Sequence, residues 1–301
     1  MKSKKSLIME KSDSMIVQKS FDQTKPTLYL VSTPIGNLED ITMRALMILK
    51  SVDIIFAEDT RNSLNLLNHY GIKTPLRSYH QHNEHDKIEA LVSVIKEGKS
   101  IALISDAGTP LINDPGESLV KACIQEAIPV VSIPGPSAFL TALTSSPLTT
   151  QPFLFYGFLP SKKTERHKIL ETLKHLPYTL VFYEAPHRIT DTLSDMKSVF
   201  NQRNITIARE LTKKFEEYIH SSLDDLEDLN TLKGEIVLLV EGLKETKVLD
   251  EHDIIDHINL LITDGLSEME AIKKAAKDRS MKKNDVYMAY KHYKKHFKDE
   301  E

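Results

Sequence analysis

Residues 27–146 alternate short apolar runs with amphipathic runs, and this alternation limits the fold more than any other feature of the chain. The runs suited to β-strands are at 27–33, 53–59, 76–80, 100–106 and 129–135. The runs with apolar residues at helical spacing are at 39–51, 60–71, 84–98, 117–127 and 137–146. Strands that alternate with helices of about ten to fifteen residues predict a mainly parallel sheet that helices cover on both faces.

The pattern becomes less regular beyond a stretch rich in Ser, Thr and Pro at 145–153. Further strands are expected at 153–159, 179–185, 204–210 and 235–241, and further helices at 162–176 and 187–200. This mixture predicts a second, α+β domain, and the tail 250–298 is typical of three short helices. We therefore expect a flexible N-terminal tail, an α/β domain, an α+β domain and a small helical segment, at 1–26, 27–148, 149–243 and 250–301.

Composition excludes several classes of protein. The chain has 301 residues, of which 41% are hydrophobic and 27% charged, and its net charge of −4 gives no sign of nucleic-acid binding by the chain as a whole. Cys123 is the single cysteine, so neither an intrachain disulfide nor a cysteine-based zinc site is expected. The longest apolar runs, of about eight residues, are too short to cross a bilayer, and residues 1–25 lack the apolar core of a signal peptide. We expect a cytoplasmic protein that does not enter membranes.

Three loops that follow predicted strands are unusually rich in Gly and Pro. They are TPIGNLED at 33–40, SDAGTPLINDPG at 105–116 and IPGPSA at 133–138. In parallel sheets, ligands bind beyond the carboxyl ends of the strands, where Gly allows close approach of the backbone and Pro stiffens a turn. Each loop alone also fits a tight turn, and NDPG at 113–116 has the composition of an ordinary β-turn. Together the loops predict a pocket with mainly backbone contacts.

Motifs that the chain lacks narrow the choice of ligand. G-x-G-x-x-G does not follow the first strand, and neither G-x-x-x-x-G-K-[ST] nor G-x-S-x-G occurs. The sequence therefore has no dinucleotide fingerprint, phosphate-binding P-loop or hydrolase nucleophile elbow. A small organic cofactor with little phosphate fits the loops best.

Eight segments, in order along the chain, carry a resemblance to a known family. They are LYLVSTPIGNLEDITMRAL, AEDTR, SDAGTPLINDPG, IPGPSA, GFLP, FYEAPHR, ARELTK and KGEIVLLVEG. With them, residues 27–243 resemble the tetrapyrrole methylase-like group of S-adenosylmethionine (SAM) methyltransferases, in particular its branch that acts on ribosomal RNA, and 250–295 resemble the helical end of that branch. Gln81 and Ala185 depart from the usual Glu and Ser, and the N-terminal extension has no counterpart.

The resemblance implies a two-domain α/β fold of the tetrapyrrole methylase-like type, with SAM bound between the domains of a homodimer. It implies methyl transfer to the ribose 2′-hydroxyl of a cytidine in the decoding region of 16S rRNA, with the assembled small ribosomal subunit as substrate. A tetrapyrrole methyltransferase on the same fold is an alternative, which the basic tail and the arginine-rich motifs argue against. A non-catalytic ribosome-assembly factor is another, which the three intact loops argue against.

Cofactor-binding residues follow from the same resemblance. The loop after the fourth strand would meet the methionine part of SAM through Asp106, Gly108, Thr109 and Pro110, although Asp106 alternatively caps a turn. The remaining residues implied at the cofactor, from the first and third loops and the second domain, are Pro34, Ile35, Gly36, Gly135, Pro136, Ser137, Ala138, Tyr183, Glu235 and Ile236.

Catalysis requires alignment above all, and a base helps because a ribose hydroxyl is a weak acid. Asp59 and Glu210 are the candidate proton acceptors, and Arg61 and Arg188 are candidates that grip phosphates beside them. Alternatively, these charged residues form salt bridges between domains. Three histidines, His80, His82 and His85, have the types and proximity of metal ligands, but no step of the reaction needs a metal, and none is predicted.

RNA contacts are expected mainly in the C-terminal segment. From Lys273 to Lys298 there are ten Lys or Arg residues, with aromatic residues interleaved, in a spacing that resembles a helix-turn-helix. The alternative is a solvated helical face with Tyr287, Tyr290, Tyr293 and Phe297 directed into a small core. The candidate RNA-binding residues, including two from the second domain, are Arg209, Lys213, Lys273, Lys274, Lys277, Arg279, Lys282 and Lys283.

Overall fold

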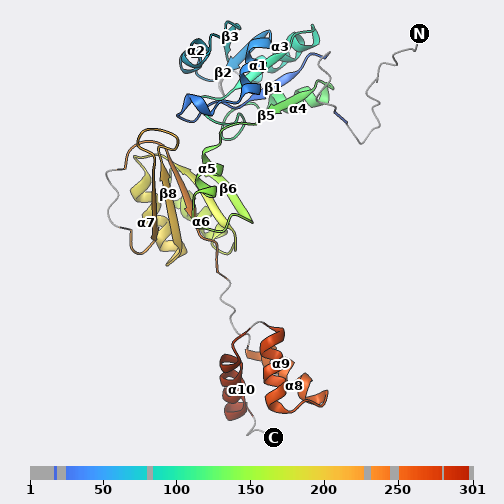
Figure 1. Ribbon diagram of the computed structural model, residues 1–301, viewed down its shortest axis with the longest axis vertical. Coiled ribbons are helices and arrows are strands. Elements are labelled where there is room, and N and C mark those ends of the chain that lie inside the picture. The colour runs from blue at the N-terminus through green and yellow to red at the C-terminus, as the bar shows by residue number, and fades with distance from the viewer. Residues whose placement is uncertain are drawn as a thin grey trace, which may run out of the picture. The chain divides into compact units, whose positions relative to one another are not determined.

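The computed structural model describes residues 17–18, 25–79, 84–226, 232–244, 251–279 and 281–297 (Figure 1). These residues belong to two compact units, Met1–Leu243 and Lys244–Glu301. The first unit contains a parallel sheet and a mixed sheet, and the second is helical. The fold class expected from the sequence is therefore confirmed.

Within the described residues, the first sheet has five parallel strands in the order β3-β2-β4-β1-β5. The strands are β1 (Leu28–Val31), β2 (Ile54–Ala57), β3 (Leu76–Ser78), β4 (Ile101–Ile104) and β5 (Val130–Ile133). Helices α1 (Met43–Ser51) and α2 (Thr60–His69) pack on one face, and α3 (Glu84–Lys96) and α4 (Glu117–Gln125) pack on the other. Because both faces are covered, β2 and β4 are buried at every position, which explains their uninterrupted apolar sequences.

The boundaries of α2 follow from local chemistry. Asp59 precedes the helix, and its Oδ1 accepts a hydrogen bond of 2.8 Å from the backbone N–H of Arg61. Gly71 follows the helix with φ +63°, a conformation that glycine adopts without strain, and Ile72 N–H then bonds Leu67 O at 2.9 Å. The short 3₁₀ helix η1 (Leu38–Asp40) precedes α1.

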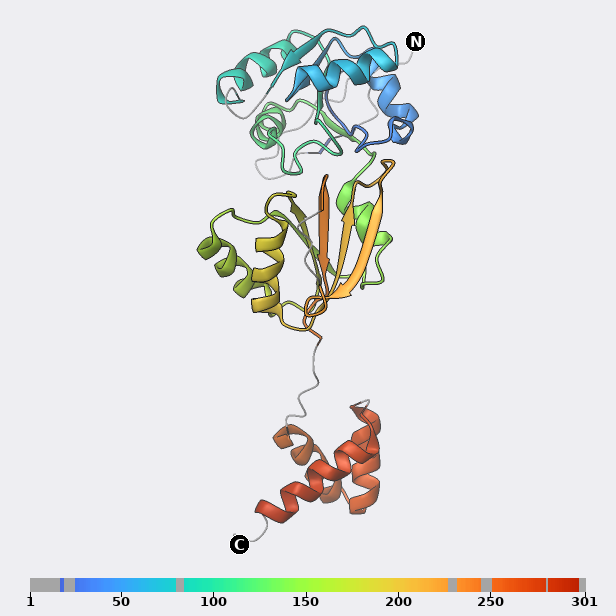
Figure 2. The same ribbon diagram turned by 90° about the vertical axis from the view of Figure 1, so that its left-hand side faces the viewer.

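In the described part of the chain, the second sheet has the order β6-β7-β10-β8-β9. Its strands are β6 (Phe153–Phe158), β7 (Thr179–Glu184), β8 (Asn204–Arg209), β9 (Glu217–Ser222) and β10 (Ile236–Val240). The β6–β7 pair is parallel and the other pairs are antiparallel. One face packs against α6 (Lys163–Leu173) and α7 (Ile189–Phe200), and the other packs against α5 (Ala138–Thr144), as Figure 2 shows. Thus α5 directly follows the loop after β5 but belongs to the core of the second sheet.

The edge strand β5 is paired by a side chain from the N-terminal extension. Gln18 Nε2 donates to Val130 O at 2.6 Å, and Gln18 Oε1 accepts from Val130 N–H at 2.9 Å. The primary amide of Gln18 thus makes the two hydrogen bonds that a neighbouring strand would make with Val130. The rest of the expected flexible tail, 1–16 and 19–24, lies outside the described residues.

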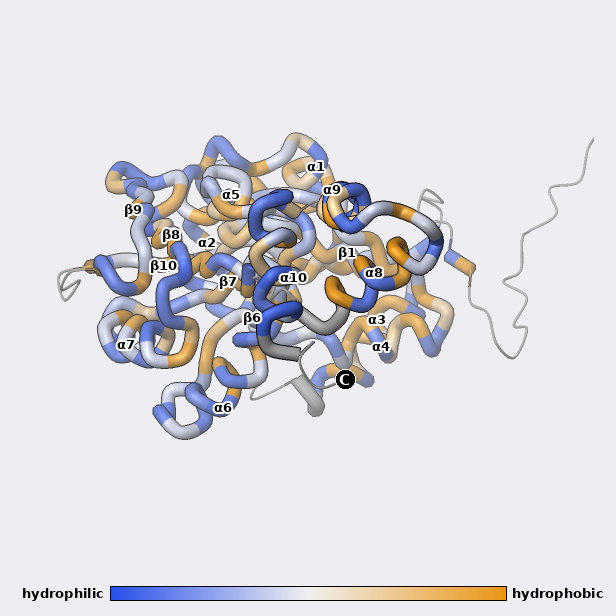
Figure 3. The backbone as a smooth tube through the Cα atoms, turned by 90° about the horizontal axis from the view of Figure 1, so that it is seen from below, coloured by the Kyte–Doolittle hydropathy of each residue, from blue (hydrophilic) through white to orange (hydrophobic). Residues whose placement is uncertain are grey.

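The second unit contains α8 (Glu251–Thr263), α9 (Glu268–Asp278) and α10 (Lys283–Phe297), which confirms the helices expected in the tail. Hydrophilic and hydrophobic residues alternate along α8 and α9 (Figure 3), and the apolar residues meet in a core that includes Ile258 and Ile272. Tyr290 is 4% exposed in this core, and Tyr287 and Tyr293 pack against it. These three aromatic residues therefore stabilise the helical unit, and Tyr290 is too buried to stack on a base, whereas Tyr287 and Tyr293 are partly exposed.

Candidate active site

Three neighbouring strands, β4, β1 and β5, bring the Gly- and Pro-rich loops together. Thr33 and Gly108 exchange backbone hydrogen bonds of 2.9 and 3.0 Å, so the first loop is paired with the second. Ser32 Oγ lies 3.1 Å from Thr109 Oγ1 and donates to Ile133 O at 3.1 Å, which ties the third strand to the other two. The loops thus form one connected wall at the carboxyl ends of the parallel strands.

The loop at 105–116 has an unusual backbone. Leu111 and Asn113 have φ values of 71° and 67°, in the left-handed region, which is costly for leucine and better tolerated by asparagine. A Cβ on Gly157 of β6 would lie 2.3 Å from Asn113 Oδ1, so only glycine lets this loop approach the second sheet so closely. The loop is therefore more than a connection between β4 and α4, because it holds a fixed shape against the second half of the unit.

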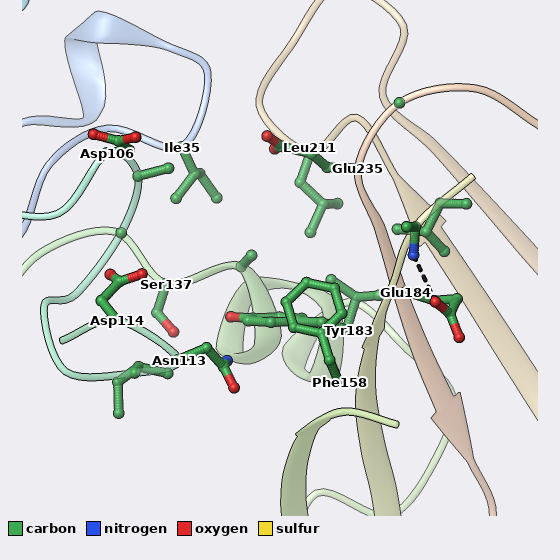
Figure 4. Close-up of a pocket in the computed structure, with 18 of the residues that line it drawn as sticks. Ile35, Asp106, Asn113, Asp114, Ser137, Phe158, Tyr183, Glu184, Leu211 and Glu235 are labelled. Atoms are coloured by element: carbon green, nitrogen blue, oxygen red, sulfur yellow. Dashed lines mark hydrogen bonds between the residues drawn. The ribbon is translucent and has the colours of Figure 1, made fainter. Parts of the chain in front are cut away.

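A cavity of about 390 Å³ lies between this wall and the second sheet (Figure 4). Its size is within the range typical of small-molecule sites. The second sheet and the segments next to it contribute mainly apolar and aromatic groups to the cavity, from Phe158, Tyr183, Leu211, Ile236 and Val237. The rings of Tyr183 and Phe158 meet edge to face, with centroids 5.6 Å apart.

The opposite side of the cavity is acidic, with Asp106 and Asp114 shown on the first-sheet side in Figure 4. Burial, together with the nearby carboxylates of Glu58 and Asp106, raises the pKa of Asp114 to about 6. Glu184 also lines the cavity, but its carboxylate accepts hydrogen bonds from Ala185 N–H at 2.8 Å and from Thr192 Oγ1 at 2.5 Å. The two aspartates give the cavity a local preference for a cationic ligand.

Most of the cofactor-binding residues expected from the sequence border this region. Those that line the cavity are Ile35, Asp106, Gly108, Thr109, Ser137, Ala138, Tyr183, Glu235 and Ile236. Pro34 and Gly36 line an adjoining cavity, whereas Pro110, Gly135 and Pro136 line neither. A Cβ on Gly135 would lie 2.7 Å from Ser32 Cβ, so this glycine serves the packing of the loops.

Asn113, Asp114, Phe158 and Leu211 line the cavity but were not expected there. Asn113 and Asp114 belong to NDPG, which the sequence also allows as an ordinary turn, and Phe158 lies in GFLP, one of the family-like segments. In the sequence, only the loop or motif as a whole indicated a site; no single one of these residues did.

The adjoining cavity measures about 590 Å³ and shares Ile35, Asp106, Ala107 and Glu235 with the first. Its other wall is a face of α2 that includes Asn62, Ser63, Asn65, Leu66 and His69. The shared residues mean that ligands in the two cavities would meet at a common boundary.

Asp59 and Arg61 lie beside these cavities without lining either of them. Asp59 Oδ2 pairs with Arg61 NH2 at 3.2 Å, and the hydrogen bonds from Arg61 lower the pKa of Asp59. Asp59 N–H donates to Asp106 Oδ1 at 3.1 Å. The backbone of Asp59 therefore positions Asp106, while its side chain is engaged by Arg61.

Glu210 is held in a network with Lys213 and Glu235. Lys213 Nζ donates to Glu210 Oε1 at 3.0 Å and to Glu235 Oε2 at 3.1 Å, and the hydrogen bond from Lys213 lowers the pKa of Glu210. Glycines make this network possible, because a Cβ on Gly36 would lie 2.4 Å from Lys213 Cγ, and one on Gly234 would lie 2.2 Å from Glu210 Oε1. The network joins the loop after β1 to the loops of the second sheet.

The two other arginines considered from the sequence are also engaged. Arg188 NH2 donates to Leu159 O at 2.7 Å, and its Nε lies 3.5 Å from Glu184 Oε1. Arg209 Nε donates to Glu217 Oε2 on the neighbouring strand. Each contact lies within the second-sheet region, so neither arginine pairs with the first sheet through these bonds.

The candidate RNA-binding residues of the second unit lie on or next to α9 and at the start of α10. Lys273, Lys274, Lys277, Lys282 and Lys283 are exposed. Arg279 is half-buried, and its Nε donates to His257 Nδ1 at 3.2 Å. The exposed lysines are available to phosphates, whereas Arg279 helps to hold α9 against α8.

The described ranges show neither a cluster of three or more potential metal ligands nor a helix long and apolar enough to cross a membrane. His80, Gln81 and His82 lie outside these ranges, and the side chain of His85 is also not described.

Comparison with known proteins gives close relatives. The family model for Tetrapyrrole (Corrin/Porphyrin) Methylases matches residues 27–227. A protein of Halalkalibacterium halodurans named Ribosomal RNA small subunit methyltransferase I is 46% identical over 287 residues, which cover 92% of this chain and 99% of the relative. The Bacillus subtilis protein of the same name is 47% identical over 272 residues, covering 87% of this chain and 93% of that one.

Among solved structures, uroporphyrin-III-C-methyltransferase from Thermus thermophilus aligns with a TM-score of 0.52 and 20% identity. The alignment covers 72% of this chain and 94% of that chain. At this identity the likeness concerns the fold alone.

Proposed function

The chain belongs to the family of tetrapyrrole (corrin/porphyrin) methylases, and from this membership we propose that it transfers a methyl group from SAM to RNA of the small ribosomal subunit. The observation that carries the proposal is the close similarity, over nearly the whole chain, to proteins named Ribosomal RNA small subunit methyltransferase I. The cavity chemistry supports it independently, because it suits a cationic cofactor.

The residues of the first cavity fit SAM, whose sulfonium and ammonium groups are positively charged. Neither Asp106 nor Asp114 has an ion-pair partner among the described residues, so both carboxylates are available to these groups. Tyr183, Phe158 and Ile236 offer the flat apolar surface that an adenine ring needs. We infer that the loop at 105–116 holds the methionine part and that the second sheet covers the adenine.

SAM supplies a methyl group on a positively charged sulfur, which makes that carbon susceptible to attack by a hydroxyl oxygen. The main task of the chain is therefore to align the acceptor hydroxyl with the cofactor and to exclude water. Asp106 and Glu235 line both cavities and are the carboxylates placed to take up the hydroxyl proton. The backbone N–H of Asp59 orients Asp106, and the ammonium group of Lys213 orients Glu235. Asp59 and Lys213 are therefore positioning residues.

Replacement of the two aspartates, compared at saturating SAM so that weaker cofactor binding does not contribute, separates proton uptake from positioning. Asp106→Asn should lower kcat strongly, whereas Asp59→Asn, which leaves the backbone N–H in place, should lower it less. The reverse order would return Asp59 to the role of proton acceptor.

We propose further that the modified group is a cytidine 2′-hydroxyl in the decoding region and that the exposed lysines of α9 contact RNA phosphates. The support is the resemblance in sequence and the position of Lys273, Lys274 and Lys277 on the surface of a separate helical unit. A homodimer and a cytoplasmic location remain predictions from the same resemblance, and analytical ultracentrifugation tests the first.

The decisive experiment incubates the purified chain with SAM labelled in the methyl group and with small ribosomal subunits that lack the modification. Label should enter the RNA, and primer extension at low nucleotide concentration should stop at a single 2′-O-methylated position. Label in uroporphyrin-III instead would favour the tetrapyrrole alternative. Calorimetric binding of SAM without transfer to either substrate would favour a non-catalytic role.

A further inference from the structure

The second cavity adjoins the cavity that fits the cofactor. It shares Asp106 and Glu235 with the cavity that fits the cofactor, so a group bound there would face the methyl donor. The other side of this cavity is formed by Asn62, Asn65 and His69, which lie on one face of α2 because they are three, four and seven residues apart.

The chemistry of this face suits hydrogen bonds to a neutral, planar group. Each asparagine amide presents both a donor and an acceptor, and the His69 imidazole can present either. Leu38 and Leu66 add apolar surface to the same cavity. Mixed donors and acceptors beside apolar surface are what the edge and face of an unstacked nucleobase require.

Ser63 gives a second, independent indication of a ligand. Ser63 is 4% exposed and lines the second cavity, yet its side-chain hydroxyl has no hydrogen-bond partner among the described residues. Buried polar atoms in folded proteins almost always have a partner. A polar group of a bound substrate would supply the one that Ser63 lacks.

The charged groups that line the second cavity favour one class of methyl-acceptor substrate over another. Lys213 is the one Lys or Arg among its described lining residues, and it is already bound to Glu210 and Glu235. A macrocycle with several carboxylates would therefore lack cations to pair with, whereas the base and ribose of a nucleotide are neutral. The phosphates can stay outside, near Arg61, whose side chain is 91% exposed beside Asn62.

We propose that this cavity receives one nucleotide of the small-subunit RNA, extruded from its stack, with its base against α2 and its ribose at the boundary with the cofactor cavity. Extrusion follows from the geometry, because a base inside a helix cannot enter a cavity of this kind. Asn62, Ser63, Asn65 and His69 then determine which nucleotide is methylated. This inference rests on the proposed function and assigns its acceptor site.

The test compares Asn65→Ala and Ser63→Ala with Asn68→Ala, a control on the same helix that lies outside the cavity and is exposed. Each variant receives labelled SAM and small ribosomal subunits that lack the modification. Both cavity variants should lower kcat/KM for subunits by about tenfold, the effect expected from one lost base contact. The SAM dissociation constant should stay within about twofold of the wild-type value, as expected for variants that leave the cofactor cavity intact.

Two further readouts separate substrate binding from a structural role. Ser63→Ala should unfold at the same or a higher temperature than wild type, because the hydroxyl it removes has no hydrogen-bond partner in the described part of the chain. The second readout compares subunits that carry the natural base at the methylated position with subunits that carry another base there. The ratio of their kcat/KM values should be smaller for Asn65→Ala than for the wild type.

Wild-type kcat/KM in both cavity variants would overturn the inference while leaving the proposed function intact. A wild-type chain that binds SAM but methylates no subunits would instead overturn the proposed function, and the inference with it. Faster methylation of uroporphyrin-III than of subunits would assign the cavity to a macrocycle.

Discussion

Asp114 offers a prediction in which stability and cofactor binding change in opposite directions. Burial and the carboxylates of Glu58 and Asp106 raise its pKa from 3.8 to about 6. The folded chain therefore binds more protons than the unfolded chain between these two values, and stability falls as pH rises through this range. At neutral pH the folded protein carries the full cost of a charged Asp114.

The pKa difference gives the size of the effect for Asp114→Asn. At 1.36 kcal/mol per pH unit, the difference between 3.8 and about 6 corresponds to about 3 kcal/mol. Because Asp114 is only half-buried, we expect solvent screening to reduce the gain to about 1–2 kcal/mol at pH 7.5. The difference between variant and wild type should vanish only below the ordinary pKa of 3.8, at about pH 3, where the wild-type carboxyl is protonated in both states.

The same substitution should weaken SAM binding at pH 7.5 by about tenfold, because a carboxylate facing the positive groups of the cofactor is lost. In the wild type, SAM affinity should rise as pH increases from 5 to 7.5, since a bound cation favours the ionised carboxyl. In the variant this pH dependence should be absent.

Urea denaturation and titration calorimetry at several pH values measure the two effects. Asp256→Asn, on the exposed surface of α8, is the control and should change neither quantity. A variant that is less stable than wild type at pH 7.5, or that binds SAM with unchanged affinity, would refute the reasoning.

Three further predictions concern other parts of the chain. Asp195→Asn should cost about 3–5 kcal/mol in the unfolding free energy, because it leaves Arg166, 4% exposed and now paired at 2.6 Å, as an uncompensated buried charge. Gly36→Ala should cost about 1–3 kcal/mol and slow methyl transfer, since its Cβ would displace Lys213. Gly98→Ala is its control, because Gly98 also has a positive φ, +101°, but no described atom would lie within 4 Å of the added Cβ; this variant should lose stability and leave transfer unchanged. Replacing the three lysines at 273, 274 and 277 by Ala should raise KM for subunits and reduce the salt dependence of binding without affecting SAM affinity, and an unchanged KM would contradict a role in RNA binding.

The parallel half of the fold was predictable because its strands are buried on both faces and its helices have one apolar face. The run at 100–106 therefore contains β4, and the pattern at 60–71 contains α2. In the second sheet, β9 was missed because EYIHSS forms a half-exposed edge that, among the strands that the structure describes, pairs with β8 alone. Such a strand needs no apolar run, so its sequence carries little signal.

Of the candidate site, the sequence predicted the parts that depend on special backbone conformations. Gly and Pro at three strand ends marked the loops, since those residue types reveal special turns. Charged side chains were less informative, because sequence does not show that Arg209 has Glu217 opposite it or that Lys213 lies over Gly36. Asn62 and Asn65 gave no signal, since polar residues on a helix ordinarily face solvent.

The hydrogen bonds of Gln18 to Val130 have a consequence for association. The outer edge of β5 would otherwise offer unpaired amide and carbonyl groups to any extended chain that came near it. A side chain that binds both backbone groups of Val130 obstructs strand addition at that position without adding a strand to the sheet. A chain shortened by its first 24 residues should therefore self-associate more readily, which light scattering at rising concentration would detect.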